Sequence, residues 1–306
     1  MDFESLKQSQ SSFDKITKAL EQSSEKPEIS GNSKNKYQDD RIWKPELDKT
    51  GNGYAVIRFL PATNGEDMPW VRVWSHAFQG AGGWYIENSL TTLGQKDPVS
   101  EENTRLWNTG VDADKEIARK RKRKLSYYAN ILVMSDPKHP ENEGQVKLFK
   151  FGKKIFDKIT EAMKPEFEDE KPINPFDFWE GANFKLKIRK VDGYWNYDKS
   201  EFDSPTAIAS NDEAIEEIWN KQYALKPFLA PENFKSYDEL KSKLDKVLSG
   251  VRNTGTAEDV AIPPVTQVSK PDVVAETVSA PTPAVEEDED SDETLSYFSK
   301  LAEEDE

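Results

Sequence analysis

The sequence predicts a mainly β fold with added helices, of the α+β class. Three segments carry strand signals, residues 54–61, 127–134 and 183–190, and each is bounded by turn-forming residues. Two others, residues 151–163 and 236–249, place apolar residues at helical spacing. With 306 residues, the chain is long enough for one large domain or two modest ones, with room for tails.

The N-terminal region predicts a short helix followed by a linker. Phe13, Ile16 and Leu20 have the spacing of one helical face within residues 1–22. A helix this short is marginal alone, so we expect it to dock on another surface. Residues 23–42 are polar and read as a linker before a body that spans residues 43–250.

Strands and helices of the body follow from apolar periodicity. In residues 54–61, Ile57 and Phe59 share one face and Arg58 lies on the other. The segment 183–190 predicts one core face and one row of cations, Lys185, Lys187 and Arg189. Ser236 and Glu239 predict a capping box that opens a late helix ending at Gly250.

After Gly250 the composition changes. Residues 251–284 are rich in Pro, Ala, Thr and Val without helical period and predict a disordered linker. Residues 285–306 hold 11 acidic residues and one Lys, which leaves a net charge of −5 for the other 284 residues. In this acidic tail, Leu295, Phe298 and Leu301 have the spacing of a short helix that folds on a partner.

Composition argues against several classes of protein. The chain has no cysteine and two histidines, so thiolate metal sites are impossible. No run of 18 apolar residues and no signal peptide is evident, so we expect a soluble, intracellular protein. Phosphate-loop, nucleophile-elbow and HExxH motifs are absent, and His76 among aromatics indicates a core or strand position more than a base.

Cations and aromatics occur together twice. Seven of the ten residues 115–124 are cationic, and the run leads into Tyr127 and Tyr128. Tyr194, Trp195 and Tyr197 follow the cationic strand. Cations attract phosphates and aromatic faces stack on unpaired bases, so the pattern favours single-stranded nucleic acid. A localisation-type basic loop, a solvated strand face and a buried aromatic cluster remain the alternatives.

The motifs GNGYAVIRFLP, GGWYIE, KRKLSYYANILVMSDP, FGKKIFDKI and WEGANFKLKIRKVDGYWNYDKSEF cover most of residues 43–203. In this order they resemble the single-stranded DNA-binding protein of T-even-type bacteriophages. The resemblance implies an OB-fold core with an inserted subdomain and a helical C-terminal part. It also implies a DNA groove built from Arg58, Trp107, Lys122, Arg123, Lys124, Tyr127, Tyr128, Phe149, Lys150, Tyr194 and Tyr197. The cationic row Lys185, Lys187 and Arg189, which follows from strand alternation, completes the candidate set.

The chain departs from the family at two places. Known members hold a structural zinc through one His and three Cys; His76 falls on the His position, but Ser89 occupies the first Cys position. We therefore expect no cofactor, and residues 86–118 to be ordered by packing or to remain mobile. The family's early basic self-association motif is absent in that form, and residues 5–9 are at best a weak remnant.

Taken together, the expectation is a non-enzymatic, cooperative, largely sequence-independent single-stranded DNA-binding protein. The resemblance implies roles in phage DNA replication, recombination and repair in the cytoplasm of the infected bacterial host. Residues 1–22 would serve self-association, and residues 285–306 would recruit replication and recombination proteins and compete with DNA for the groove. The alternatives are a scaffold or adaptor and, more remotely, a nuclease.

Overall fold

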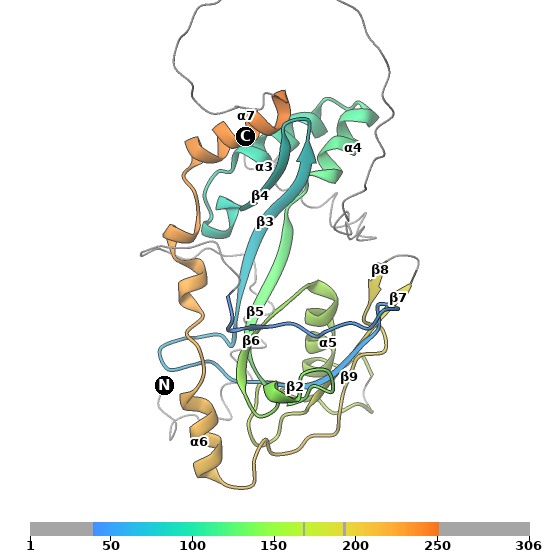
Figure 1. The fold of residues 1–306 in the computed structure, drawn as a ribbon, viewed down its shortest axis with the longest axis vertical. Coiled ribbons are helices and arrows are strands. Elements are labelled where there is room, and N and C mark those ends of the chain that lie inside the picture. The colour runs from blue at the N-terminus through green and yellow to red at the C-terminus, as the bar shows by residue number, and fades with distance from the viewer. Residues whose placement is uncertain (1–38, 168, 192–193, 251–306) are drawn as a thin grey trace, which may run out of the picture.

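The computed structural model describes residues 39–250 except 168 and 192–193 (Figure 1). In this part of the chain the fold is mixed α+β, with a nine-stranded sheet and five α-helices. The helical arm expected at 1–22, most of the linker 23–42 and both C-terminal segments lie outside the described residues.

The main sheet has the strand order β1-β6-β5-β2-β7-β8. Strand β1 pairs with β6 in parallel, and the other neighbours on this path are antiparallel. The strands are β1 (Ile42–Trp43), β2 (Gly53–Phe59), β5 (Lys124–Ser135), β6 (Val146–Phe151), β7 (Phe184–Val191), β8 (Tyr194–Asn196) and β9 (Glu201–Phe202), the last paired with β7.

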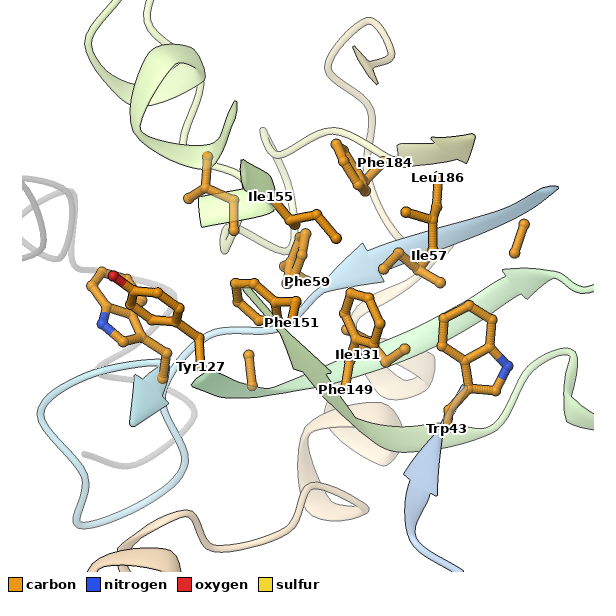
Figure 2. Close-up of a cluster of buried hydrophobic side chains, with 14 of the residues drawn as sticks. Trp43, Ile57, Phe59, Tyr127, Ile131, Phe149, Phe151, Ile155, Phe184 and Leu186 are labelled. Atoms are coloured by element: carbon orange, nitrogen blue, oxygen red, sulfur yellow. The ribbon is translucent and has the colours of Figure 1, made fainter. Parts of the chain in front are cut away.

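One face of this sheet encloses the largest core, in which aromatic rings dominate (Figure 2). Alternation along each strand turns every second side chain inward, so Ile57, Phe59 and Leu186 are fully buried. The ring of Phe59 lies 5.6 Å from that of Phe151 and from that of Phe176. Helix α5 (Lys153–Met163) closes this core with its apolar stripe.

A second part rises from the sheet, because β3 (Trp70–Gly80) and β5 are long strands that extend beyond it (Figure 1). Strand β3 pairs with β5 and, in a hairpin, with β4 (Gly83–Asn88). The 3-10 helix η1 (Leu90–Leu93) and helices α3 (Pro98–Asn108), α4 (Asp112–Lys120) and α7 (Tyr237–Ser249) belong to this part. We call residues 70–125 together with α7 the hairpin subdomain.

The hairpin subdomain has its own core, in which Phe78 and Tyr85 stack at 5.1 Å and Leu240 and Leu244 of α7 are buried. A Cβ atom on Gly82 would lie 2.1 Å from the carbonyl oxygen of Lys246, so only glycine allows this approach.

The opposite face of the main sheet carries a third core, which includes Leu60, Phe178 and Ile215. Helix α6 (Asp212–Asn220) covers it. The short 3-10 helices η2 (Pro140–Asn142), η3 (Lys226–Leu229) and η4 (Pro231–Asn233) complete the described elements. The C-terminal end of β2 is therefore buried on both faces, which decides the environment of Arg58.

The predicted strands at 54–61, 127–134 and 183–190 are confirmed as β2, β5 and β7, with shifted ends. Helix α5 begins two residues later than predicted. The capping box of Ser236 and Glu239 and the left-handed Gly250 that ends α7, with φ of 71°, are confirmed. Of the two expectations for residues 86–118, ordering by packing is the one observed, since this segment holds η1, α3 and most of α4.

Candidate nucleic-acid interface

An open pocket of about 260 Å³ lies at the edge of the largest core. Strand β6 contributes Phe149 to Phe151, and β7 contributes Leu186 and Ile188. The remaining lining residues are Lys44, Pro45, Leu47, Ile155, Trp195 and Tyr197. The pocket thus combines an apolar floor with aromatic side chains and two lysines.

Pairing between β7 and β8 decides which aromatic side chain faces the pocket. Trp195 is paired with Lys190, so it shares a face with the inward-pointing Leu186 and Ile188. Tyr194 is paired with Val191 and lies on the opposite face. Trp195 is 46% exposed although it lines the pocket, so its ring is accessible from solvent.

The DNA-binding residues predicted from the sequence included Tyr194 and Tyr197 but not Trp195 or Lys44. Tyr197 packs half-buried against the core and lines the pocket. The aromatic run after the cationic strand was recognised in the sequence, but which of its rings faces the core depends on the pairing of β8 with β7. Lys44 carries no comparable sequence signal, because it follows a two-residue strand.

The cations of the pocket differ from those of the predicted row. Within the described part of the chain, Lys44 and Lys150 form no ion pair, and the ammonium group of Lys150 lies 5.6 Å from the ring of Tyr128. The row on β7 points to the other face, because it alternates with Leu186 and Ile188.

Each cation of that row meets a carboxylate. Lys185 contacts Asp203 at 2.8 Å, Lys187 contacts Glu201 at 2.7 Å, and Arg189 approaches Asp198 at 3.8 Å. The hydrogen bond with Asp203 raises the pKa of Lys185, and the hydrogen bond from Lys187 lowers that of Glu201. A phosphate arriving at this face must therefore compete with carboxylates for these cations.

Three residues of the implied groove lie in the interior. Arg58 is 0% exposed and donates hydrogen bonds from Nη2 to the carbonyl oxygens of Asp177 and Thr206. Burial lowers its pKa to about 10. Tyr127 is buried and stacks on Phe156 with ring centres 4.0 Å apart. Phe149 is buried as well, although it lines the pocket.

The burial of Arg58 does not fit a phosphate-binding role, because its guanidinium group is covered by the loops that precede β7 and follow β9. The burial of Tyr127 likewise does not fit a base-stacking role, since both neighbouring rings are core residues. Both side chains lie in the interior of the protein rather than on its surface.

The other candidates lie in or beside the hairpin subdomain. The guanidinium carbon of Arg123 lies 4.1 Å above the ring of Trp74, and Lys122 and Lys124 are partly exposed beside it. Two cations of α4 lie over the ring of Trp107, Lys115 at 6.0 Å and Arg119 at 5.3 Å. Tyr128 stacks on Phe228 at 4.5 Å. The structure brings together Phe149 and Tyr197 at the pocket. Lys150 borders the pocket but reaches toward Tyr128, and so connects the pocket with the cation–aromatic groups near β5.

The region that holds zinc in the implied family has a different donor set here. His76 and Ser89 are buried, and Asp97 is buried between them. No group of three or more His, Cys, Asp or Glu residues within the described ranges could hold a metal ion. Among the same residues, no helix is long and apolar enough to cross a membrane.

Comparisons with known proteins all match DNA-binding proteins. The family described as gp32 DNA binding protein like matches residues 51–248. The chain is 41% identical over 245 residues to the single-stranded DNA-binding protein of Enterobacteria phage T2, covering 78% of each chain. It is 39% identical over 259 residues to the protein of the same description from Enterobacteria phage T4, covering 82% of each chain.

Proposed function

Since this chain belongs to the gp32-like family of DNA-binding proteins, we propose that it binds single-stranded DNA at the pocket between β6, β7 and Trp195. The supporting observation is that the half-exposed ring of Trp195 lines the same opening as Tyr197 and Lys44. Lys150 borders the pocket, but it alternates with Phe149 and Phe151 and its ammonium group lies toward Tyr128 on the other face of β6. Aromatic faces stack on bases of any identity, and the lysines attract the phosphates that connect them.

Single strands suit this site better than duplexes. A base must leave its stack to lie on Trp195, and an unpaired base does so at lower cost than a paired one. The apolar floor formed by Leu186 and Ile188 offers no pattern of hydrogen-bond donors and acceptors that distinguishes one base edge from another. Binding is therefore largely independent of sequence.

The bound DNA strand continues along β5 toward the hairpin subdomain. Tyr128 and the cations Lys122, Arg123 and Lys124 lie on this route, and Trp107 lies near its end. Strand β5 links both parts, so one bound strand can contact both. The sheet formed by β1, β2, β5, β6 and β7 corresponds, in this proposal, to an OB-fold.

The wider role is non-enzymatic. The protein coats single strands during phage DNA replication, recombination and repair in the cytoplasm of the bacterial host. Residues 1–22 support cooperative self-association, and residues 285–306 recruit partners through Leu295, Phe298 and Leu301. Relatives that carry the description single-stranded DNA-binding protein support the DNA-binding part of this role.

The test is a titration of intrinsic tryptophan fluorescence with oligo-dT and with duplex DNA across a series of salt concentrations. Oligo-dT should quench strongly and duplex weakly, and the affinity for oligo-dT should fall steeply with salt because bound phosphates release counterions. Absence of quenching by either DNA would contradict the proposal and favour a protein scaffold. Release of nucleotides on addition of magnesium would favour a nuclease.

A further inference from the structure

The carboxylate of Asp97 lies at the centre of a buried polar cluster in the hairpin subdomain. Its side chain and that of His76 are each 1% exposed. Asp97 precedes α3, and His76 lies on β3, so the cluster joins segments that are distant in sequence. A buried carboxylate is unfavourable unless it is well paired, so the partners of Asp97 decide its contribution.

Both oxygens of Asp97 accept hydrogen bonds. Oδ2 accepts from the hydroxyl of Ser89 at 3.0 Å and from the backbone N–H of Leu90 at 3.1 Å. Oδ1 accepts from the backbone N–H groups of Val99 and Ser100, both at 3.0 Å, which caps α3. All four partners are donors, so they match a charged carboxylate.

His76 connects this cluster to the end of α4. Its Nε2 atom lies 3.3 Å from Oδ1 of Asp97. Its Nδ1 atom lies 2.9 Å from the carbonyl oxygen of Arg121. A carbonyl and a carboxylate only accept, so the contact with Arg121 needs a proton on Nδ1 and the contact with Asp97 needs one on Nε2. Asn103 of α3 donates to the same carbonyl at 3.1 Å. The cluster therefore ties β3, η1, α3 and the residue that follows α4.

The side chains of this cluster do not fit, as metal ligands, the zinc site that the family implies. Structural zinc needs four ligands in a tetrahedron, most of them thiolates or imidazoles. This chain has no cysteine, Ser89 uses its hydroxyl to donate to Asp97, and the oxygens of Asp97 already accept four hydrogen bonds. Only His76 could serve as a usual ligand.

We propose that Asp97 replaces a metal ion as the structural centre of the hairpin subdomain, and that this subdomain folds without metal. A carboxylate can do so because it accepts several hydrogen bonds from different directions, as a metal ion gathers several ligands. Burial acts to raise the pKa of Asp97, but contacts with His76, Ser100 and Ser89 hold it below its ordinary value, which keeps the carboxylate charged.

The first test uses the unaltered full-length protein. We expect no stoichiometric zinc by elemental analysis, and the same melting temperature before and after dialysis against EDTA or after addition of zinc. One zinc per chain, or a melting temperature that falls on chelation, would overturn the proposal. This measurement requires no variant and so does not depend on how a substitution folds.

The second test measures hydrogen exchange in Asp97→Asn. The amide NH₂ group must face one of the donors around Asp97, so peptides from residues 76–121 should exchange at least roughly tenfold faster. Peptides from β2, β6 and β7 should keep their protection. Glu102→Gln on the same helix is the matched control, because Glu102 pairs at the surface with Arg105. Unchanged exchange in Asp97→Asn would overturn the central role of this residue.

Ser89→Ala provides a milder variant. It removes one of the four hydrogen bonds to Asp97 without leaving a new donor against the carboxylate. Exchange in residues 76–121 should rise by less than in Asp97→Asn but in the same peptides. Faster hydrogen exchange confined to other regions of the protein would contradict the structural role proposed for the Asp97 cluster. None of these readouts depends on DNA binding, so the proposal can fail or hold independently of the proposed function.

Discussion

Trp195 is the residue on which the proposed site depends most. It is 46% exposed, so its removal costs little packing energy, yet its ring lines a pocket with an apolar floor. A large aromatic face in this position is unfavourable toward water and favourable toward a base. Function explains its exposure better than folding does.

Replacing Trp195 with Ala should weaken oligo-dT binding by about 1–3 kcal/mol, the usual value of one base–aromatic stack. Because the substitution also removes a fluorophore, binding is best followed by the anisotropy of a labelled oligonucleotide. The melting temperature should change little, which separates loss of stacking from unfolding.

Tyr194→Ala is the matched control for Trp195. Tyr194 is similarly exposed and adjacent in sequence, but β8 turns it to the opposite face. Its removal should leave affinity nearly unchanged. Equal losses in the two variants would contradict the placement of the strand in the pocket and favour contact with both faces of β8.

Arg58 illustrates what the sequence can predict about one side chain and what it cannot. Alternation correctly separated Arg58 from Ile57 and Phe59, because period two is a local property of a strand. It could not show that residues more than a hundred positions away cover the other face of β2 and supply carbonyl acceptors to Arg58. The aromatic and cationic character of the site was predictable, whereas the exposure of each side chain depends on such long-range packing.

At the scale of elements, strand β7 presents two chemically different faces. Its inner face forms the floor of the pocket, and its outer face carries cations that are already paired with Asp198, Glu201 and Asp203. Exposed ion pairs contribute little stability, but they lower the net charge that a phosphate meets. The lysines at the pocket and those on β7 should therefore differ in their effect on DNA binding.

Lys44→Ala combined with Lys150→Ala should reduce the slope of log K against log salt concentration by ~1.4, the contribution of two phosphates on a single strand. The triple Ala variant of Lys185, Lys187 and Arg189 should change the slope less, despite losing more charges, because these cations are paired. Affinities for oligo-dT at several salt concentrations give both slopes. A larger change in the triple variant would contradict the screening of the β7 cations by their carboxylate partners.

Helix α7 is held on strand β4 by a partly buried ion cluster. Glu87, with its side chain 9% exposed, contacts both Lys235 and Lys243. Burial acts to raise the pKa of Glu87, but the hydrogen bonds from the two lysines lower it below the ordinary value of 4.5. A lowered folded-state pKa stabilises the fold above the unfolded-state pKa and loses this contribution as the pH falls through the folded-state value.

Glu87→Gln should therefore destabilise the docking of α7 by about 1–2 kcal/mol at neutral pH, the range expected when a partly buried charged hydrogen bond is lost. The difference from the unaltered protein should vanish as the pH falls well below 4.5. Hydrogen exchange of residues 237–249 measures both effects. Glu217→Gln on α6, which breaks an exposed pair with Lys221, should leave the exchange of residues 237–249 unchanged and serves as the control.

The elements themselves were unequally predictable. The capping box and terminal glycine of α7 are local signals, and the sequence indicated both ends of that helix. Helices α3 and α4 were not predicted, because their polar surfaces obscure a short apolar stripe, although the Asp97 cap and Pro98 at the first helical position are local start signals of α3. The parallel pairing of β1 with β6 joins segments about a hundred residues apart and has no local signal.

At the scale of the whole molecule, the charge is divided between a nearly balanced body and an acidic tail. Residues 285–306 carry 11 of the 57 acidic residues in the chain, together with a single Lys. A tether of this kind gives the tail an effective concentration on the order of millimolar near the body. Under the proposed function, the tail competes with DNA for the cations along β5 and at the pocket.

Deleting residues 285–306 should raise the affinity for oligo-dT at low salt, and the gain should shrink as salt screens both the tail and the DNA. The matched variant replaces Leu295, Phe298 and Leu301 with Ala, which preserves every charge of the tail. It should bind DNA as the full chain does, because competition depends on charge. A gain in the alanine variant would assign the effect to apolar docking, and no gain on deletion would contradict competition by the tail.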